Sequence, residues 1–589
     1  MPDNPPMTAR SLEPDPHPAL VPAVSVRGTR GAVTSPHPLA SQAGIAMLRA
    51  GGSAVDAAIA TNAALAVVTS HSCGLGGDAF WLIWTADDGL EALNGSGRSA
   101  AGASLDAARA AGLGEMPVRG AWTVTVPGAI RSWGDAHRRH GRLSWDALLR
   151  PAIELADSFP ASPGWSGAIE RSAAVFGADS DWARVFRPDG HPWRVGQVVR
   201  LPALARTLRR LADEGPDLAY DGDLARGAAR YLEAAGSPLR FKDFASHTST
   251  WVDPIRGAYR GIEAASHPPN SSGAVALELL HVLDALDPPG PAAFGPHGIS
   301  DARWVHLQLE AARLAIADRD AHLSDLETMA PGALEHLLDR DHAARLAMRL
   351  DPGHVLPFPA VEAPAGGGTI YLAAVDADGT AVSLIESNYQ GFGSGLVDPE
   401  TGVAYQNRGA FFSLDPRHAN VLAPRKRTMH TLTPGMLFRD GRPWIVHGAM
   451  GGEIQPQVFA QLVSAVVDGG RSIADAVAAP RFAADAAAHY APLTLSRLED
   501  GMLPEVGAAL SAMGHDVVWA PRLSRALGHE HAIELVYDAG GDAAAAPGEP
   551  SGEATGDDAR QARTPSGATR PASVIATADP RSEGLPAAW

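Results

Sequence analysis

One threonine in the chain stands where a self-generated catalyst could form. Three glycines, Gly366 to Gly368, precede Thr369, and an alternating apolar run follows it. If the chain is cut between Gly368 and Thr369, one residue carries both a hydroxyl nucleophile and, in its new α-amino group, a base. Because such an amine titrates near about 7.7–8.0, a useful fraction is unprotonated near neutral pH. The junction predicts self-cleavage and acyl chemistry on Thr369; the alternative is an ordinary strand threonine after a flexible loop.

Two strand-like runs place a second hydroxyl beside this threonine. Residues 369–375 and 381–387 alternate in the manner of strands, and the turn residues 376–380 between them indicate a hairpin. A tight hairpin sets Ser387 roughly opposite Thr369. We therefore expect Ser387 to contact the Thr369 hydroxyl or amine, unless it is simply a strand serine.

The remaining elements change in style along the chain. The first half is mainly helical, whereas the second half joins strands by short turns, and this combination predicts a layered arrangement of helices and sheets. A second hairpin is expected around 439–442, and its second strand leads through Gly451 and Gly452 into a helix. Helices are expected at 38–49, 55–68, 309–323 and 456–467, and further strands at 80–84 and 574–577.

Composition excludes several classes of protein. The chain has 589 residues and a formal net charge of −18, and no basic patch large enough to follow a phosphate backbone is visible, so no nucleic-acid partner is expected. Cys73 is the only cysteine, so no intrachain disulfide can form, and we interpret it as a small buried residue. No run of about 18 apolar residues and no signal peptide is recognised, so we expect no membrane span and a cytoplasmic location.

Two segments are poor in large apolar residues. Residues 1–27 are interpreted as a flexible arm, and residues 538–572, rich in Ala, Gly, Pro, Asp and Thr, as a disordered insertion. The second segment cannot bury enough apolar surface to offset the entropy of ordering.

Further motifs occur in a recognisable order. They are 50–58 (AGGSAVDAA), 74–80 (GLGGDAF), 126–128 (VPG), 267–273 (HPPNSSG), 310–319 (EAARLAIADR), 451–452 (GG), 479–482 (APRF) and 579–582 (DPRS). Together with the glycine–threonine junction, they resemble the γ-glutamyltransferase (glutathione hydrolase) family of N-terminal-nucleophile hydrolases, from about residue 30 to the C-terminus.

The resemblance implies a fold and a reaction. The fold would be an α+β sandwich of four layers, αββα. The chain would cleave itself into a large subunit, 28–368, and a small subunit, 369–589, intertwined in one globular unit. Thr369 would then form an acyl intermediate with a small-molecule amide, with Gly451 and Gly452 as the backbone oxyanion hole. No cofactor and no metal is implied.

The substrate pocket departs from the pattern of that family. Phe411 takes the place of the aspartate that holds a substrate ammonium, and Arg408 the place of a glutamine. His430 and Thr431 replace the paired serines that hold a carboxylate, and Arg98 is offset by about two positions from the family's arginine. We expect a pocket for an acyl group that has a carboxylate but no free amine, unless the arginines form structural ion pairs and His430 merely packs. The predicted substrate-binding residues are Arg98, Asn407, Arg408, His430 and Thr431.

These departures leave the substrate open. The runs 405–409 and 428–431 resemble a bacterial subgroup that includes oxamate amidohydrolase. We expect a γ-glutamyl or related carboxylate-bearing amide, with hydrolysis favoured over transfer. One alternative is an oxamate amidohydrolase or an acylase of simple acyl amides. A second is an uncut, non-catalytic homologue that binds carboxylates.

Overall fold

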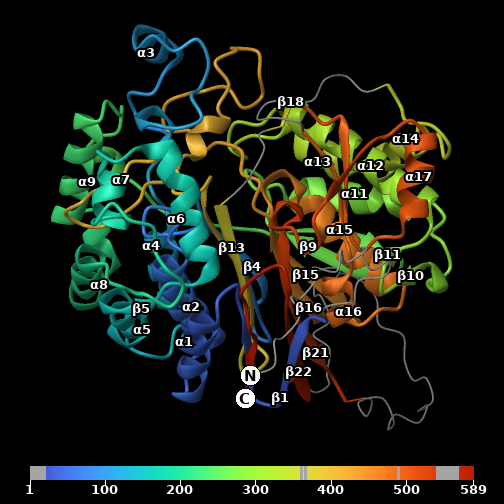
Figure 1. The fold of residues 1–589 in the computed structure, drawn as a ribbon, viewed down its shortest axis with the longest axis horizontal. Coiled ribbons are helices and arrows are strands. Elements are labelled where there is room, and N and C mark those ends of the chain that lie inside the picture. The colour runs from blue at the N-terminus through green and yellow to red at the C-terminus, as the bar shows by residue number, and fades with distance from the viewer. Residues whose placement is uncertain (1–21, 358–361, 364–367, 487–490, 539–569) are drawn as a thin grey trace, which may run out of the picture.

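The computed structural model describes residues 22–357, 362–363, 368–486, 491–538 and 570–589. Two seven-stranded sheets form the centre, and helices cover the outer face of each, as Figure 1 shows. The first sheet has the order β23 (Ala587–Ala588), β2 (Ala32–Thr34), β13 (Gly368–Val375), β14 (Ala381–Tyr389), β3 (Asp78–Thr85), β4 (Gly89–Gly95) and β7 (Thr250–Val252). The second has the order β1 (Val24–Gly28), β22 (Ser573–Ala578), β21 (His529–Val536), β16 (Arg442–Met450), β15 (Pro434–Arg439), β9 (Ile262–Ser266) and β8 (Ile255–Tyr259).

Strand alternation divides the apolar side chains among three layers. On β3, Phe80 and Leu82 lie in the core between the two sheets, whereas Trp81 and Ile83 lie in the core beneath the helices of the first sheet. Successive side chains of a strand point to opposite faces, so a strand buried on both sides is apolar throughout. Together with the helix-facing core of the second sheet, this arrangement confirms the expected four-layer αββα fold.

The outer layers come from different parts of the chain. The first sheet is covered by α1 (Pro38–Arg49), α2 (Ala54–Val68) and α4 (Ala129–His140), and α5 (Trp145–Asp157) packs on α2. The second sheet is covered by α11 (Gly273–Asp284), α15 (Gln455–Val467) and α16 (Ile473–Ala478), and α12 (Ala302–His322) packs on α11. All residues of α2 are buried, since it packs against α1, α5 and β13 at once. A capping box between Ser53 and Asp56 starts this helix.

Most elements predicted from the pattern are present. The helix at 38–49 has the predicted bounds, and the predicted hairpin pairs Thr369 with Ser387. The arm assigned to residues 1–27 is wrong at its end, because β1 pairs with β22 along Val24–Gly28. The partner strand lies about 550 residues further along the chain and supplies the backbone hydrogen bonds that local composition cannot reveal. Residues 1–21, and 539–569 of the predicted insertion, lie outside the described residues.

No helix among the described residues is both long and apolar enough to cross a bilayer. The cytoplasmic location stays a prediction.

A glycine of one sheet faces an aromatic ring of the other in the layer between the sheets. A Cβ added to Gly448 of β16 would lie 2.4 Å from the Tyr371 ring of β13. We predict that Gly448→Ala lowers the midpoint of thermal unfolding by several degrees, because overpacking a core costs about 1–3 kcal/mol. Gly290→Ala is the matched control, since a Cβ there meets no atom within 4 Å. Equal midpoints for the two variants in differential scanning calorimetry would contradict the close approach.

Candidate functional site

Thr369 is the second residue of β13 and lies at the end of the layer between the sheets. Tyr371 and Ala373, which share its face of the strand, belong to the inter-sheet core. The antiparallel register sets Ser387 of β14 directly opposite, and the Thr369 Oγ1 and Ser387 Oγ atoms are 2.9 Å apart. Both side chains are buried. The structure therefore brings together the two hydroxyls that the hairpin predicted.

Ser387 also contacts the bond that is predicted to break. A register irregularity between Gly368 and Thr369 turns the Gly368 carbonyl toward β14, where it accepts a hydrogen bond from Ser387 Oγ at 2.7 Å. Gly368 and Thr369 are consecutive residues of β13. The hydroxyl of Thr369 and the polarised carbonyl of the preceding residue thus share one partner.

Two further donors point at the Ser387 oxygen. The backbone N–H of Tyr389 donates to it at 2.7 Å, and Arg408 Nη2 donates at 3.0 Å. Tyr389 adopts φ +72°, a left-handed conformation that is uncommon for a bulky residue and that accompanies this turn of the backbone toward Ser387. Because both donors face the lone pairs of Ser387, its own hydrogen is free for the Gly368 carbonyl.

Arg408 is a fully buried cation behind Ser387. It lies on the short turn η4 (Arg408–Phe411), and its guanidinium also donates to Thr431 Oγ1 at 3.3 Å. The rings of Tyr389 and Phe411 lie 4.6 and 5.5 Å from its central carbon, within the range of cation–π attraction. Burial lowers the pKa of Arg408 to about 10, so the group stays charged near neutral pH.

His430 and Asp78 form a buried pair next to this cation. His430 Nε2 and Asp78 Oδ2 are 3.0 Å apart, while Asp78 Oδ1 accepts from the backbone N–H groups of Gly97 and Gly128. Burial, and then the Arg408 charge, lower the pKa of His430 to about 4. The imidazole is therefore neutral near pH 7 and donates to Asp78, whose negative charge helps to offset Arg408.

The other predicted pocket residues have different partners. Arg98 pairs with Asp325 at 3.2 Å and with Glu327 at 2.8 Å. Asn407 donates to the Val118 carbonyl at 2.7 Å and accepts from the backbone N–H of Gln390 at 3.1 Å. Asn407 thus anchors the segment that follows β14, and the Arg98 charge is balanced by two carboxylates. Contact of either residue with a substrate stays a prediction.

Gly451 and Gly452 follow β16 and have φ values of +157° and +61°. A Cβ on Gly451 would come within 2.7 Å of Ile454, so a side chain there would strain both the backbone and the packing. Gly451 and Gly368 line one cavity of about 480 Å³. Gly451, the first residue of the glycine pair predicted for the oxyanion hole, therefore lines the same cavity as the cleavage junction.

Two functional candidates were not predicted from the sequence. They are Asp78 and Glu386. Glu386 is adjacent to Ser387 on β14, but its side chain faces the helical layer. Glu386 accepts from the Gly74 N–H at 2.8 Å and from the Asn62 side chain, and burial raises its pKa to about 8. A carboxylate within the apolar run 381–389 was a signal that could have drawn attention to it.

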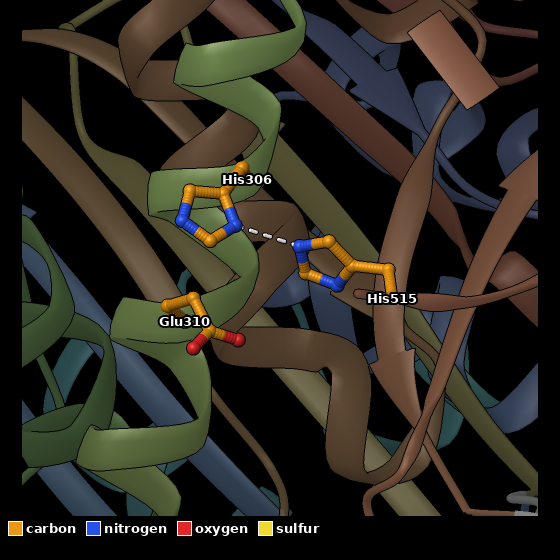
Figure 2. Close-up of side chains that lie close together, drawn as sticks. All are labelled: His306, Glu310 and His515. Carbon is orange, nitrogen blue, oxygen red and sulfur yellow. Dashed lines mark hydrogen bonds between the residues drawn. The ribbon is translucent and has the colours of Figure 1, made fainter. Parts of the chain in front are cut away.

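One buried group of side chains has the donor types of a metal site. His306 and Glu310 of α12 and His515, which precedes β20 (Asp516–Ala520), converge with ligand atoms within 4.8 Å of one another (Figure 2). Their hydrogen bonds form a complete relay. Ser496 donates to His515, His515 to His306, and His306 to the Asp351 carbonyl, each at 2.7 Å.

The surroundings of this group favour the relay over a cation. Glu310 is paired with the Arg313 guanidinium, which also donates to Ser496 at 3.0 Å. A divalent ion would have to displace the proton between the imidazoles and tolerate this neighbouring positive charge. We interpret the group as a hydrogen-bonded link between α12 and β20.

Comparisons with known proteins agree with this geometry. Residues 40–555 match the family model described as gamma-glutamyltranspeptidase. The chain is 39% identical to the glutathione hydrolase-like YwrD proenzyme of Bacillus subtilis, over 78% of this chain and 86% of that protein. It is 36% identical to the oxamate amidohydrolase proenzyme of Klebsiella pneumoniae, over 86% of this chain and 94% of that protein. The structure resembles the cephalosporin acylase of Bacillus halodurans with a TM-score of 0.83 and 33% identity, over 98% and 99% of the two chains.

The contacts of Ser387 lead to a prediction about cleavage. Ser387→Ala removes the donor to the Gly368 carbonyl, and loss of one such donor typically slows a reaction about 10²- to 10³-fold. We expect the freshly purified variant to cleave itself correspondingly more slowly, followed as the fraction of cut chain on denaturing gels. Ser383→Ala is the control, because Ser383 lies on the same face of β14 but contacts Tyr371. Cleavage of Ser387→Ala at the wild-type rate would contradict this role.

Proposed function

The chain belongs to the gamma-glutamyltranspeptidase family, and on that premise we propose that it is an autoprocessing amidohydrolase whose nucleophile is Thr369. One observation carries the proposal. The Thr369 hydroxyl lies 2.9 Å from the Ser387 hydroxyl, and the Ser387 hydroxyl lies 2.7 Å from the Gly368 carbonyl oxygen, so the three groups form one chain of contacts. Two relatives of this chain are named as proenzymes, which supports processing.

The contact chain suggests how the cut is made. Thr369 Oγ1 attacks the Gly368 carbonyl carbon while its proton moves toward the Thr369 nitrogen, and Ser387 donates a hydrogen bond to the developing oxyanion. The Arg408 charge behind Ser387 stabilises that oxyanion. Collapse breaks the bond to the Thr369 nitrogen, which takes up the proton, and leaves an ester on Oγ1. Water then hydrolyses the ester and separates residues 1–368, which include the large subunit 28–368, from the small subunit 369–589.

Turnover uses the amino group that the cut has created. The free α-amine of Thr369 accepts the hydroxyl proton while Oγ1 attacks an amide carbonyl, and the same proton leaves with the amine product. Backbone N–H groups of Gly451 and Gly452 receive the oxyanion. Water completes hydrolysis, and we propose that it outcompetes amine acceptors because the segment between Phe412 and His430 is short and leaves the pocket open.

The polar groups around Ser387 favour an acyl group without an ammonium. Arg408 and the Phe411 ring occupy the region where a counter-ion for an ammonium would be needed, and a like charge there is unfavourable. We propose a carboxylate-bearing amide as substrate, γ-glutamyl or related. Oxamate amidohydrolase or simple acylase activity is the second candidate, which the names of two similar proteins favour. An uncut carboxylate-binding homologue is the third.

Processing at Thr369 can be tested directly. Wild-type protein should give bands near about 38 and 23 kDa on denaturing gels, sharing the chain mass of 61.2 kDa by residue count. Thr369→Ala should remain uncut because it has no hydroxyl, whereas Thr369→Ser should still be cut. Sequencing the N-terminus of the smaller piece should give Thr-Ile-Tyr. An uncut, folded wild type would point to the non-catalytic alternative.

Substrate preference follows from the charge near Ser387. We expect γ-glutamyl-p-nitroanilide to show a kcat/KM at least about tenfold below that of glutaryl-p-nitroanilide, which lacks the ammonium, since one unfavourable charge contact costs about 1–2 kcal/mol. Oxamate and glutathione complete the panel, with Thr369→Ala as the blank. Equal or better turnover of the γ-glutamyl compound would refute the pocket argument while leaving the nucleophile in place.

A further inference from the structure

The cavity beside the cleavage junction has a wall of arginines that the family comparison does not explain. It has a volume of about 480 Å³ and is bordered by Gly368 and Gly451. Arg171, from α6 (Pro163–Phe176), and Arg525, from the segment before β21, both line it, as does Arg497. Two distant parts of the sequence thus bring cationic side chains to the space next to the nucleophile.

Most charged side chains around this cavity form an ion pair with another described side chain, but two of them do not. Glu453 pairs with Arg319, and Asp485 pairs with Arg497 at 2.6 Å. Among the ion pairs of the described residues, none includes Arg171 or Arg525. These two guanidinium groups therefore line the cavity without an ion-pair partner within 4.0 Å in the described part of the chain, although Glu583 acts on Arg525 from farther away.

Two neighbours of the arginines are His71 and Glu583. His71, which also lines the cavity, is buried, and burial followed by the charges of Arg525 and Arg171 lowers its pKa to about 3. Its imidazole is therefore neutral. Burial lowers the pKa of Arg525, Glu583 raises it, and Arg171 lowers it further. Glu583 offsets this repulsion in part, but one of its oxygens is already held by the Gly164 N–H.

We infer that Arg171 and Arg525 form a carboxylate subsite of the substrate cleft. Two neighbouring guanidinium groups repel each other, and a carboxylate between them relieves the repulsion and matches their planar donors. This inference rests on the proposed function, which it deepens. It assigns substrate charge recognition to the cavity, because Arg98 is paired with two carboxylates and Arg408 is directed at Ser387.

The carboxylate can belong to either part of an amide, and the test separates these sources. Glutaryl-p-nitroanilide carries it on the acyl side, N-butyryl-4-aminobenzoate on the amine side, and butyryl-p-nitroanilide is the neutral reference. For Arg171→Gln/Arg525→Gln, we expect kcat/KM to fall about 10- to 100-fold for the anionic substrate that the wild type prefers. The value for the neutral amide should change less than about twofold, and the protein should still cut itself.

Arg184→Gln is the matched control, because Arg184 is an exposed arginine of the next helix, α7 (Asp181–Phe186), paired with Asp181 outside the cavity. It should leave all three substrates unchanged. Equal losses on anionic and neutral amides in the double variant, or no loss on either, would overturn the subsite.

A binding measurement tests the carboxylate subsite independently of amide hydrolysis. Calorimetric titration with glutarate should show binding to the wild type that the double variant loses, and the neutral glutaramide should not bind either protein. If the protein fails to cut itself or to turn over any amide, the proposed function fails, but glutarate binding still decides the subsite. Absence of glutarate binding to the wild type would overturn the subsite even where amides are hydrolysed.

Discussion

The site depends on the register of β13 against β14. Strand side chains alternate between the two faces of a sheet, so a slip of one residue would turn Ser387 toward the helices and bring Glu386 into the gap between the sheets. The buried apolar residues of both strands oppose such a slip, because every one of them would change layer. The same packing that stabilises the fold therefore sets the 2.9 Å contact between the two hydroxyls.

A second constraint is the burial of the Arg408 charge. An unpaired cation in the interior is costly, and here the cost is reduced by hydrogen bonds to two hydroxyls, by two aromatic faces and by the nearby Asp78. Asp78 is in turn held by two backbone N–H groups and by His430. The protein thus builds a low-dielectric pocket in which a positive charge acts strongly on Ser387.

The sequence was sufficient for the parts of the site that depend on local pattern. The alternating run after Thr369 and its turn predicted the pairing with Ser387, and helix signals predicted α1 to the residue. Arg171 and Arg525 could not be found in this way, because α6 and the segment before β21 meet only through the packed layers. The sequence also placed residues 24–27 in a flexible arm, because the pairing of β1 with β22 joins opposite ends of the chain and leaves no local signal.

The order of strands in the two sheets has a consequence for how the protein assembles. In the first sheet, β2 lies between β23 and β13, and in the second, β22 lies beside β1. A cut after Gly368 therefore leaves both sheets woven from two separate polypeptides. Such a weave forms most readily while one continuous chain still keeps its strands together, because tethering lowers the entropy of bringing them into contact. With a cut after Gly368, the uncut precursor would act as its own assembly template, and two separated subunits that unfolded would have to find each other without that tether.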